Sequence, residues 1–405
     1  MTDIINNRDI VVVGQQAWDV DIGSNNINIA KEFAKHNRVL YVNPPLDTIT
    51  VLRYKNDEKV KKRLNIIAGS EKDLLKVGDN IWTFYPKIKL TSSNWIKISK
   101  IFDFMNKKNN IKFANEIKRV INELNFQNII LFNDSDMFRS FYLKELLQPD
   151  ISVYYSRDNM IVMDYFKTHG VRIEAELIRK SDLAVANSTY LSEYCKKFNP
   201  NSFYVGQGCD LSLFNKELIK GEPDDVKDIS HPRIGYVGAL LTLRLDIEII
   251  EYIANYNSEW QIILVGPEDD TFKNSKLHNM KNVHFTGPKD SALLPAYINS
   301  FDICINPQLL NEVTIGNYPR KIDEYLAMEK PVVATKTIAM SIFSDYTYLA
   351  NKKEDYAKLI EIALKEDSEI KKSERRAFAS SHTWENNVKE IYKAINYIYK
   401  QRNGN

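Results

Sequence analysis

Two series of short apolar runs, each alternating with amphipathic stretches, constrain the fold of this chain more than any other feature. Short apolar segments with helical patterns between them are typical of parallel strands whose two faces are covered by helices. The sequence therefore predicts an α/β protein with two doubly wound, Rossmann-like domains. The runs of the first series are 10–13, 39–42, 128–132, 152–155 and 183–186, and those of the second are 234–237, 262–265, 283–285, 303–305 and 332–333.

A charged segment separates the two series. Residues 216–231, KELIKGEPDDVKDISH, are poor in apolar side chains and contain glycine and proline. This composition is typical of a linker between domains. We therefore expect an N-terminal domain over residues 1–215, a linker over 216–231, a C-terminal domain over 232–384 and a final helix within 385–405.

The composition is that of a globular chain. Of its 405 residues, 44% are hydrophobic, which is enough for ordinary cores, and no apolar run reaches the roughly 18 residues of a membrane span. The N-terminus lacks a basic start followed by an apolar signal segment, so we expect a cytoplasmic protein. Cys195, Cys209 and Cys304 are far apart and have no paired histidines, which favours reduced thiols over disulfides or a zinc site.

Residues 318–335, YPRKIDEYLAMEKPVVAT, predict a helix that begins at one proline, ends before another and is followed by a buried strand. Arg320, Lys321 and Glu324 then lie on the first turns of this helix, directly after an irregular loop. A helix N-terminus with two cationic side chains attracts phosphate, and a nearby carboxylate can accept hydrogen bonds from sugar hydroxyls. The segment therefore predicts a site for a nucleotide diphosphate, and the alternative is a surface helix with ordinary charges.

The loops after the strands of the second series supply further candidates, because ligands of open α/β sheets bind outside the carboxyl ends of the strands. Glycines in such loops allow a ligand to approach the backbone closely. Arg244 could reach a diphosphate, or it could be a surface residue at the start of a helix. The candidate donor-site residues are Gly238, Arg244, Gly266, Thr286, Gly287, Asn306, Thr314, Ile315, Gly316, Asn317, Arg320, Lys321 and Glu324.

Seven segments in a specific order carry a resemblance to a known family. They are DIVVVG at 9–14, RVLYVNPP at 38–45, ELIRKSDLAVANSTYL at 176–191, RIGYVGAL at 233–240, WQIILVG at 260–266, NVHFTG at 282–287 and the segment 318–335. Together they resemble GT-B glycosyltransferases of the group 1 type (family 4 and its relatives), especially enzymes of polysaccharide assembly such as the teichuronic acid glycosyltransferases. The resemblance covers nearly the whole chain. It implies a GT-B fold, in which two Rossmann-like domains face each other across a cleft and the last helix packs toward the N-terminal domain.

The resemblance also implies a reaction. The expected activity is transfer of a sugar from a nucleotide diphosphate sugar, UDP by expectation, to a glycan or polyprenyl-linked acceptor in cell-surface polysaccharide synthesis. No cofactor and no metal are expected, because Arg244, Arg320, Lys321 and helix N-termini can offset the charge of the leaving diphosphate. Two alternatives stay open: a nucleotide-sugar epimerase or glycan phosphorylase on the same fold, and a non-catalytic nucleotide-sugar-binding protein.

The chain departs from the usual group 1 pattern at one position. The family has two glutamates eight residues apart, the first facing the donor sugar and the second facing the nucleotide ribose. Glu324 matches the second, whereas Gly316 stands at the first. A subset that resembles the xanthan glucuronosyltransferase also lacks the first carboxylate, keeps a lysine at the position of Lys321 and inverts the anomeric centre. We therefore expect inversion, although retention is usual in family 4.

The loops after the strands of the first series are then expected to hold the acceptor and the catalytic base. In an inverting transfer a carboxylate takes the proton of the acceptor hydroxyl. Asp158 and Asp134 are the candidates, and the alternative for both is a loop-capping aspartate. A structural role is the alternative for His169. The candidate acceptor residues are Gly14, Gln15, Gly23, Ser24, Asn25, Arg157 and His169.

The segment 51–120 is strongly basic, with 17 lysines and arginines against 7 aspartates and glutamates, and aromatic residues lie between the lysines. Such a surface is attracted to anionic lipid headgroups. We expect a cytoplasmic protein that can bind peripherally to the inner face of the cell membrane, and a solvated lysine-rich face is the alternative. No motif for nucleic-acid recognition is present, so nucleic acid is not an expected partner.

Overall fold

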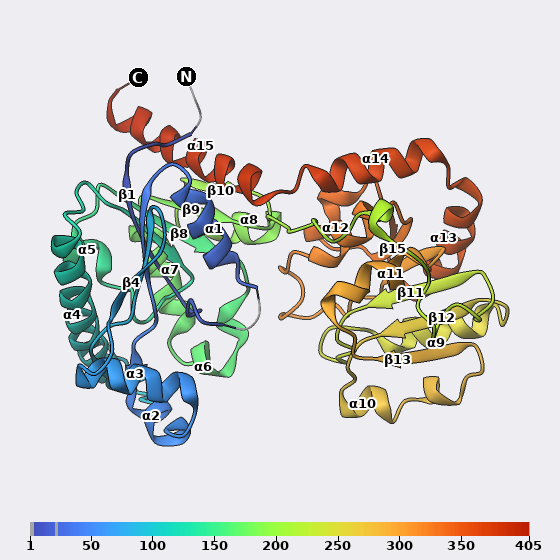
Figure 1. The fold of residues 1–405 in the computed structure, drawn as a ribbon, viewed down its shortest axis with the longest axis horizontal. Coiled ribbons are helices and arrows are strands. Elements are labelled where there is room, and N and C mark those ends of the chain that lie inside the picture. The colour runs from blue at the N-terminus through green and yellow to red at the C-terminus, as the bar shows by residue number, and fades with distance from the viewer. Residues whose placement is uncertain (1–3, 21–22, 405) are drawn as a thin grey trace. The chain divides into compact units, whose positions relative to one another are not determined.

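The computed structural model describes residues 4–20 and 23–404, which form two compact units. Unit 1 comprises the described residues up to Gly206 and those from Trp384 onward, and unit 2 is Gln207–Thr383 (Figure 1). Each unit contains one large sheet with helices on both faces. The predicted α/β class with parallel sheets in two domains is confirmed.

The sheet of unit 1 has the strand order β10-β9-β8-β7-β1-β2-β5-β4, and only the β4–β5 pair is antiparallel. All residues of β1 and β8 are buried, as the continuous apolar runs predict. Two short strands, β3 and β6, form a separate two-stranded sheet. The strands are β1 Asp9–Gly14, β2 Arg38–Val42, β3 Leu46–Asp47, β4 Leu74–Gly78, β5 Ile81–Phe84, β6 Lys89–Leu90, β7 Ile130–Asp134, β8 Ile151–Ser156, β9 Leu183–Ala186 and β10 Ser202–Tyr204.

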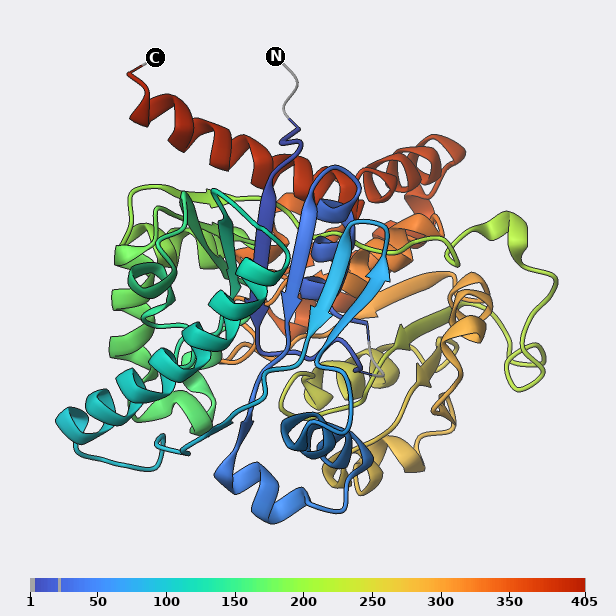
Figure 2. The same ribbon diagram turned by 60° about the vertical axis from the view of Figure 1, so that its left-hand side comes forward.

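Successive side chains of a strand point to opposite faces, so the sheet of unit 1 has two cores. Ile10 and Val12 of β1 face a core that contains helices α1 and α15, whereas Val11 and Val13 face a core that contains α4. Helices α2 and α3 lie beyond one end of the sheet (Figures 1 and 2). The helices are α1 Asn25–Ala34, α2 Thr48–Tyr54, α3 Glu58–Ala68, α4 Ser99–Glu123, α5 Leu143–Leu147, α6 Asp164–Lys167, α7 Gly170–Lys180, α8 Thr189–Lys196 and α15 Trp384–Arg402.

The last helix, α15, belongs to unit 1. Its apolar stripe, which includes Ile391 and Ile395, is part of the core beneath α1. The ring of Tyr392 lies 5.5 Å from that of Phe33, and its hydroxyl accepts a hydrogen bond from Asn37 Nδ2 at 2.9 Å. The C-terminal helix therefore completes a core that begins with the first strand of the chain.

The sheet of unit 2 has the order β13-β12-β11-β14-β15-β16, and all of its pairs are parallel. Helices α9 and α13 cover one face, and α11 and α12 cover the other. The strands are β11 Arg233–Val237, β12 Gln261–Val265, β13 Val283–Gly287, β14 Ile303–Asn306, β15 Val332–Thr335 and β16 Tyr348–Ala350. The helices are α9 Ile247–Tyr256, α10 Asp270–Lys273, α11 Leu294–Asn299, α12 Arg320–Ala327, α13 Lys353–Glu366 and α14 Glu369–Ser380.

The segment 216–231, expected as a free linker, packs on unit 2. Val226 is fully buried in the core beside α11 and α12. The guanidinium of Arg233, which is 2% exposed, donates to the carbonyls of Ile229 and Lys227 and to the carboxylate of Glu222 at 2.9 Å. One charge of the segment, that of Glu222, thus pairs with a buried arginine, and the structure divides the chain after Gly206 instead of after residue 215.

Candidate functional site

Helix α12 carries the predicted donor-site cluster. Pro319 precedes its first residue, and Ile322, Tyr325 and Leu326 are fully buried against the sheet of unit 2. The hydroxyl of Tyr325 accepts a hydrogen bond from the backbone N–H of Val237 at 2.9 Å, which fixes the helix to the end of β11. The opposite side of the helix carries Arg320, Lys321 and Glu324, as the sequence predicts.

Lys321 lies over the carboxyl end of β11. Its Nζ donates a hydrogen bond to the hydroxyl of Tyr236 and lies 4.1 Å from the centroid of that ring. A Cβ atom on Gly238 would lie 2.9 Å from the same Nζ. The ammonium group is therefore held directly beside the loop that follows β11.

Three glycines lie at the ends of the adjacent strands β11, β12 and β13. Gly238, Gly266 and Gly287 have φ values of +141°, +148° and +70°, which residues with a side chain rarely adopt. The N–H of Gly266 donates to the carbonyl of Gly287 at 3.0 Å, and a Cβ on Gly266 would lie 2.0 Å from the carbonyl oxygen of Gly238. Gly266 is buried at this contact, whereas Gly238 is half-buried beside the side chains of Lys321 and Tyr236, which a ligand at the end of β11 would meet.

The loop after β14 is bound to the loop after β11. The N–H of Leu309 donates to the carbonyl of Arg244 at 2.9 Å, and Asn311 Nδ2 donates to the carbonyl of Leu243 at 2.8 Å. Thr314 is buried, and its hydroxyl donates to the carbonyl of Leu309. The predicted residues Arg244 and Thr314 therefore lie on two loops that are joined by hydrogen bonds.

The remaining predicted donor-site residues have contrasting environments. Within the described part of the chain, the side-chain oxygens Oγ1 of Thr286 and Oδ1 of Asn317 are buried and have no hydrogen-bond partner. Gly316 is buried and Ile315 is half-buried, whereas Arg244 and Arg320 are exposed. Asn306 is buried at the end of β14, where its carbonyl accepts a hydrogen bond from Tyr356.

Glu324 is half-buried on α12. Burial raises the pKa of its carboxyl group above the ordinary value, while the charges of Arg320 and Lys321 act in the opposite direction. A carboxylate in this setting gains from hydrogen-bond donors such as sugar hydroxyls. Gly316, eight residues earlier, offers no second carboxylate, as the sequence predicts.

The inner side of α12 carries a second polar cluster that the sequence did not reveal. Asp323 is fully buried, with its Oδ1 2.6 Å from His382 Nδ1 and its Oδ2 3.2 Å from the thiol of Cys209, which donates to it. Burial and Asp323 raise the pKa of the Cys209 thiol well above its usual value, so this thiol is not an activated nucleophile. Asp323 thus joins α12 to the first and last segments of unit 2.

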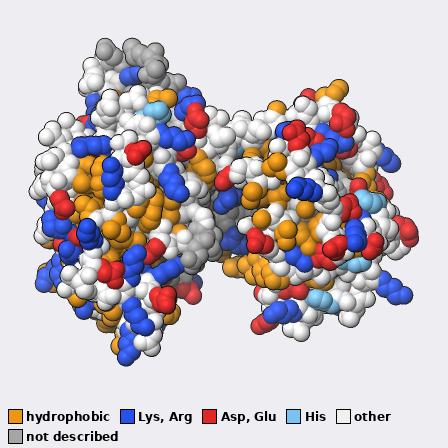
Figure 3. All heavy atoms as spheres, viewed as in Figure 1, with side chains coloured by type: hydrophobic (Ala, Val, Ile, Leu, Met, Phe, Trp, Pro, Cys, Tyr) orange, Lys and Arg blue, Asp and Glu red, His pale blue; other side chains and the backbone are white. Residues whose placement is uncertain are grey.

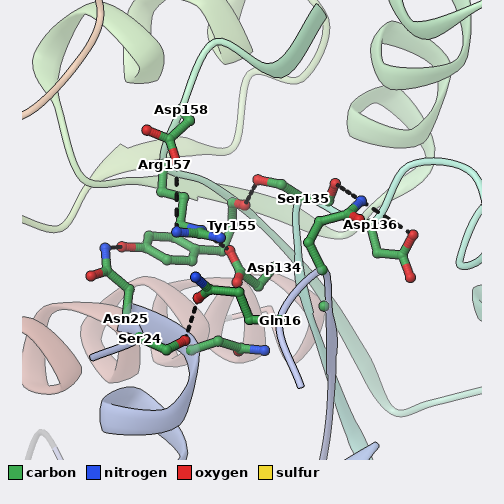
Figure 4. Close-up of polar contacts among 12 residues, drawn as sticks. Gln16, Ser24, Asn25, Asp134, Ser135, Asp136, Tyr155, Arg157 and Asp158 are labelled. Atoms are coloured by element: carbon green, nitrogen blue, oxygen red, sulfur yellow. Dashed lines mark hydrogen bonds and ion pairs between the residues drawn. The ribbon is translucent and has the colours of Figure 1, made fainter. Parts of the chain in front are cut away.

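In unit 1, Arg157 lies between two carboxylates (Figure 4). Its Nε donates to Oδ1 of Asp134 at 2.8 Å, and its Nη1 lies 3.6 Å from Oδ2 of Asp158. Asp134 is fully buried at the end of β7, and its Oδ2 has no hydrogen-bond partner among the described residues. Burial raises the pKa of Asp134 to about 6, although Arg157 opposes the shift.

Asp158 differs from Asp134 in its access to solvent. Its side chain is 45% exposed, whereas that of Asp134 is inaccessible. A base that takes a proton from a substrate must reach it, and a buried carboxylate that binds an arginine serves first to position that arginine. The geometry therefore favours Asp158 over Asp134 for contact with a substrate.

Several of the predicted acceptor residues surround this group. Asn25 Nδ2 lies 3.5 Å from the hydroxyl of Tyr155, and the hydroxyl of Ser24 donates to Oε1 of Gln16 (Figure 4). Gln15 accepts a hydrogen bond from Arg139 at 2.7 Å.

The two glycines predicted for the acceptor site differ in packing. A Cβ on Gly14 would lie 2.5 Å from Nδ2 of Asn26, so the strand end is closely packed there. Gly23 is exposed, with no atom within 4 Å of such a Cβ. Gly14 is therefore needed for packing, whereas the structure imposes no such requirement at Gly23.

His169 has the contacts of a structural residue. It is 3% exposed, its ring stacks on Phe102 at 3.9 Å between centroids, and its Nε2 lies 2.6 Å from the carbonyl oxygen of Ile96. These contacts attach the start of α7 to α4 and favour the structural alternative over acceptor binding.

Sequence reasoning missed Tyr236, Tyr155 and Arg139, which contact Lys321, Asn25 and Gln15. Both tyrosines lie within apolar runs, where a tyrosine is indistinguishable from other core residues. Only their positions one or two residues before a strand end could have indicated a ligand site.

The two α/β units, with a phosphate-compatible helix and glycine loops at the strand ends of unit 2, define a GT-B protein. The alignments with solved structures of this fold cover nearly all of this chain and of each solved chain. The Anabaena protein Alr3699/HepE in complex with UDP has a TM-score of 0.65 at 14% identity, over 96% of this chain and 100% of that one. Sucrose-phosphate synthase from Thermosynechococcus elongatus has a TM-score of 0.63 at 14% identity, over 98% and 100%.

The chain therefore has the GT-B fold, and a glycosyltransferase family model matches most of its unit 2. Residues 231–366 match the family described as "Glycosyl transferases group 1". The chain is also 30% identical over 174 residues to the Bacillus subtilis (strain 168) protein named "Putative teichuronic acid biosynthesis glycosyltransferase TuaH". That match spans 40% of this chain and 42% of the relative's length.

Proposed function

We propose that the protein is a glycosyltransferase that moves a sugar from a nucleotide diphosphate sugar to a glycan or polyprenyl-linked acceptor in cell-surface polysaccharide synthesis. The observation that carries the proposal is the position of Lys321, whose ammonium group lies beside Gly238 at the end of β11. A diphosphate bound over the glycine loops would meet this cation and the N-terminus of α12. The match to group 1 glycosyltransferases over residues 231–366 supports the same function.

UDP is the proposed nucleotide. The buried, unpaired oxygens of Thr286 and Asn317 are available to accept hydrogen bonds from a ligand, and Glu324 can accept them from ribose hydroxyls. The structural neighbour from Anabaena was solved in complex with UDP, which supports this choice. The absence of a carboxylate at Gly316 leaves recognition of the sugar to other groups.

The donor site is tested by calorimetric titration of UDP. Lys321→Ala and Glu324→Ala should each weaken UDP binding by about tenfold or more, because a charge-assisted hydrogen bond contributes roughly 1.5–3 kcal/mol. Lys365→Ala, at an exposed lysine of α13, is the matched control and should bind UDP as the wild type does. Unchanged affinity in both site variants would remove the assigned donor site.

The proposed reaction is a single displacement with inversion. Asp158 takes the proton of the acceptor hydroxyl, the acceptor oxygen forms a bond to the anomeric carbon, and the bond from that carbon to the diphosphate oxygen breaks. The electron pair leaves with the diphosphate, whose charge Lys321 and Arg320 offset without a metal. NMR of the product anomer checks the stereochemistry, and wild-type turnover of Asp158→Asn would exclude this residue as the base.

The two alternatives predict different products. An epimerase converts a nucleotide sugar without any acceptor, and a phosphorylase acts on a free glycan with phosphate, whereas a binding protein shows no turnover. Incubation of the purified protein with UDP-sugars alone, then with acceptors, separates them: acceptor-dependent release of UDP supports the glycosyltransferase. Epimerised donor in the absence of acceptor would support the epimerase instead.

We further propose that the protein works in the cytoplasm, at the inner face of the cell membrane, where unit 1 meets an acceptor carried on an anionic lipid. Exposed Leu52 and Phe104 lie in the basic segment, and basic and hydrophobic side chains are neighbours on the visible face of unit 1 (Figure 3). Within residues 4–20 and 23–404, no helix has the length and hydropathy of a membrane span. Attachment would therefore be peripheral for this part of the chain. Nucleic acid is not among the proposed partners.

A further inference from the structure

Unit 1 contains a cavity of about 380 Å³ that none of the predicted site residues line. Its walls come from α2, from the loop after β6 and from α4, and they are joined by hydrogen bonds. The carboxylate of Asp47 accepts from Ser92 Oγ at 2.5 Å and from the N–H of Thr50 at 3.0 Å. Thr91 and Asn109 exchange two hydrogen bonds of 3.1 and 2.8 Å. The cavity is therefore preformed, and its volume lies in the range of small-ligand sites.

The interior and the rim of the cavity have different chemistry. Asn106, Asn109 and Ser93 line the interior and are 3%, 6% and 7% exposed, so amides and hydroxyls face the bound molecule. The rim carries Trp95 and Tyr165, which are 67% and 54% exposed. Trp95 Nε1 donates to the carbonyl of Ser92 at 2.9 Å, which holds the indole ring in place.

Sugars present two kinds of surface, hydroxyl groups around the ring and C–H groups on its faces. Amides and hydroxyls pair with the former, and exposed aromatic rings cover the latter. The cavity also adjoins the predicted acceptor residues, because Arg139 lines it and donates to Gln15 Oε1 at 2.7 Å. Nε of Arg139 donates to both carboxylate oxygens of Asp136, so part of its charge is already paired.

We propose that this cavity binds a saccharide unit of the acceptor, with Trp95 and Tyr165 packing against the sugar faces. The proposal rests on the proposed glycosyltransferase function and adds residues to its acceptor side. Both rings belong to unit 1, and neither was predicted as an acceptor residue from the sequence.

Tryptophan fluorescence tests the proposal, since Trp95 alone among the five tryptophans, all of them described, lines the cavity. The probes are soluble tetrasaccharides of neutral hexoses, of N-acetylhexosamines and of hexuronates. At least one should change the emission in a saturable manner, and Trp95→Phe should abolish the change. Tyr165→Ala should weaken that saccharide's binding roughly tenfold, the size of a lost aromatic contact. Its UDP affinity, measured by calorimetry, should stay that of the wild type.

Tyr397→Ala is the matched control, because this tyrosine is also about half exposed on unit 1 but lies on α15. It should bind the saccharide as the wild type does. If no tetrasaccharide alters Trp95 emission, or if Tyr165→Ala binds as tightly as the wild type, the cavity is not a saccharide site. Failure of the wild-type protein to bind UDP would instead refute the donor function and would leave a saccharide response intact. The two failures are therefore distinguishable.

Discussion

At the scale of single residues, the two neighbouring aspartates of unit 1 show how burial separates their roles. Asp134 is inaccessible and binds Arg157 at 2.8 Å, whereas Asp158 is 45% exposed. Burial disfavours the charged form of a carboxyl group, so Asp134 holds its proton to a higher pH than an ordinary aspartate does. Asp158 lies beside the positive charge of the same arginine and is open to solvent.

This difference predicts a pH dependence of stability. The pKa of Asp134 is about 6 in the folded protein and about 3.9 in an unfolded chain, so the folded state binds more protons between these values. The raised pKa of Asp134 therefore stabilises the folded state fully below about pH 4. This contribution to the free energy of unfolding, about 3 kcal/mol, is lost as the pH rises through 6.

Denaturant unfolding of wild type and Asp134→Asn between pH 4 and 7 measures this effect. The wild type should lose stability relative to the variant as the pH rises, since asparagine cannot titrate. Parallel stability curves would contradict the raised pKa. Asp150→Asn is the control and should run nearly parallel to the wild type over this range, because hydrogen bonds from Tyr399 and Arg8 outweigh burial and lower the pKa of Asp150 below its ordinary value of about 3.9.

At the scale of elements, three strand ends of unit 2 depend on backbone that only glycine can supply. Gly266 is the most demanding, because its φ of +148° and its distance to the carbonyl of Gly238 both exclude a side chain. This close approach brings the loops after β11 and β12 together beneath Lys321.

Gly266→Ala should therefore destabilise unit 2 by about 3 kcal/mol or more, from backbone strain and a clash with backbone atoms. Chemical denaturation, monitored by circular dichroism, measures the change in the free energy of unfolding. Gly221→Ala is the matched control in the same unit, because no atom lies within 4 Å of its added Cβ, and it should change stability by less than about 0.5 kcal/mol. Equal stability of the two variants would show that the loops relax.

The elements that the sequence predicted well share a local signal, and those it missed do not. Strands β1, β8, β11 and β12 are continuous apolar runs, and α12 lies between two prolines, so fold class and donor helix could be predicted. Strand β4 is mostly exposed and lacks that signal. The segment 216–231 looked like a linker because it is charged and poor in apolar side chains, whereas the burial of Val226 and the contacts with Arg233 depend on the tertiary structure. Contacts such as Lys321 with Tyr236 depend on tertiary packing in the same way.

At the scale of the whole molecule, unit 1 displays apolar side chains on a basic surface. Helix α2 has no buried residue among its seven, and Leu52 is 79% exposed. Ile98 and Phe104, around the start of α4, are each more than 60% exposed. Rings and aliphatic groups of this kind enter a lipid interface while the neighbouring lysines meet anionic headgroups.

Liposome flotation should therefore show binding of the protein to anionic vesicles at low ionic strength and release at high ionic strength. Four or five engaged basic residues at about 1 kcal/mol each suffice for reversible attachment, and salt screens them. The double variant Leu52→Ser with Phe104→Ser should bind more weakly at both ionic strengths. Ile370→Ser, an equally exposed apolar residue of α14 in unit 2, is the control. Equal absence from anionic vesicles at both ionic strengths would show that the basic face is only solvated.

The place of α15 in the core of unit 1 has a consequence for biosynthesis. The chain emerges from the ribosome with most of unit 1 first, then all of unit 2, and the helix that supplies Val388, Ile391 and Ile398 to the first core comes last. Domains fold as units during synthesis, so the second unit to be translated is the first that can finish folding. Until α15 has emerged, the nascent unit 1 keeps the α15-facing part of its core uncovered, and such transiently exposed apolar surface is prone to aggregation.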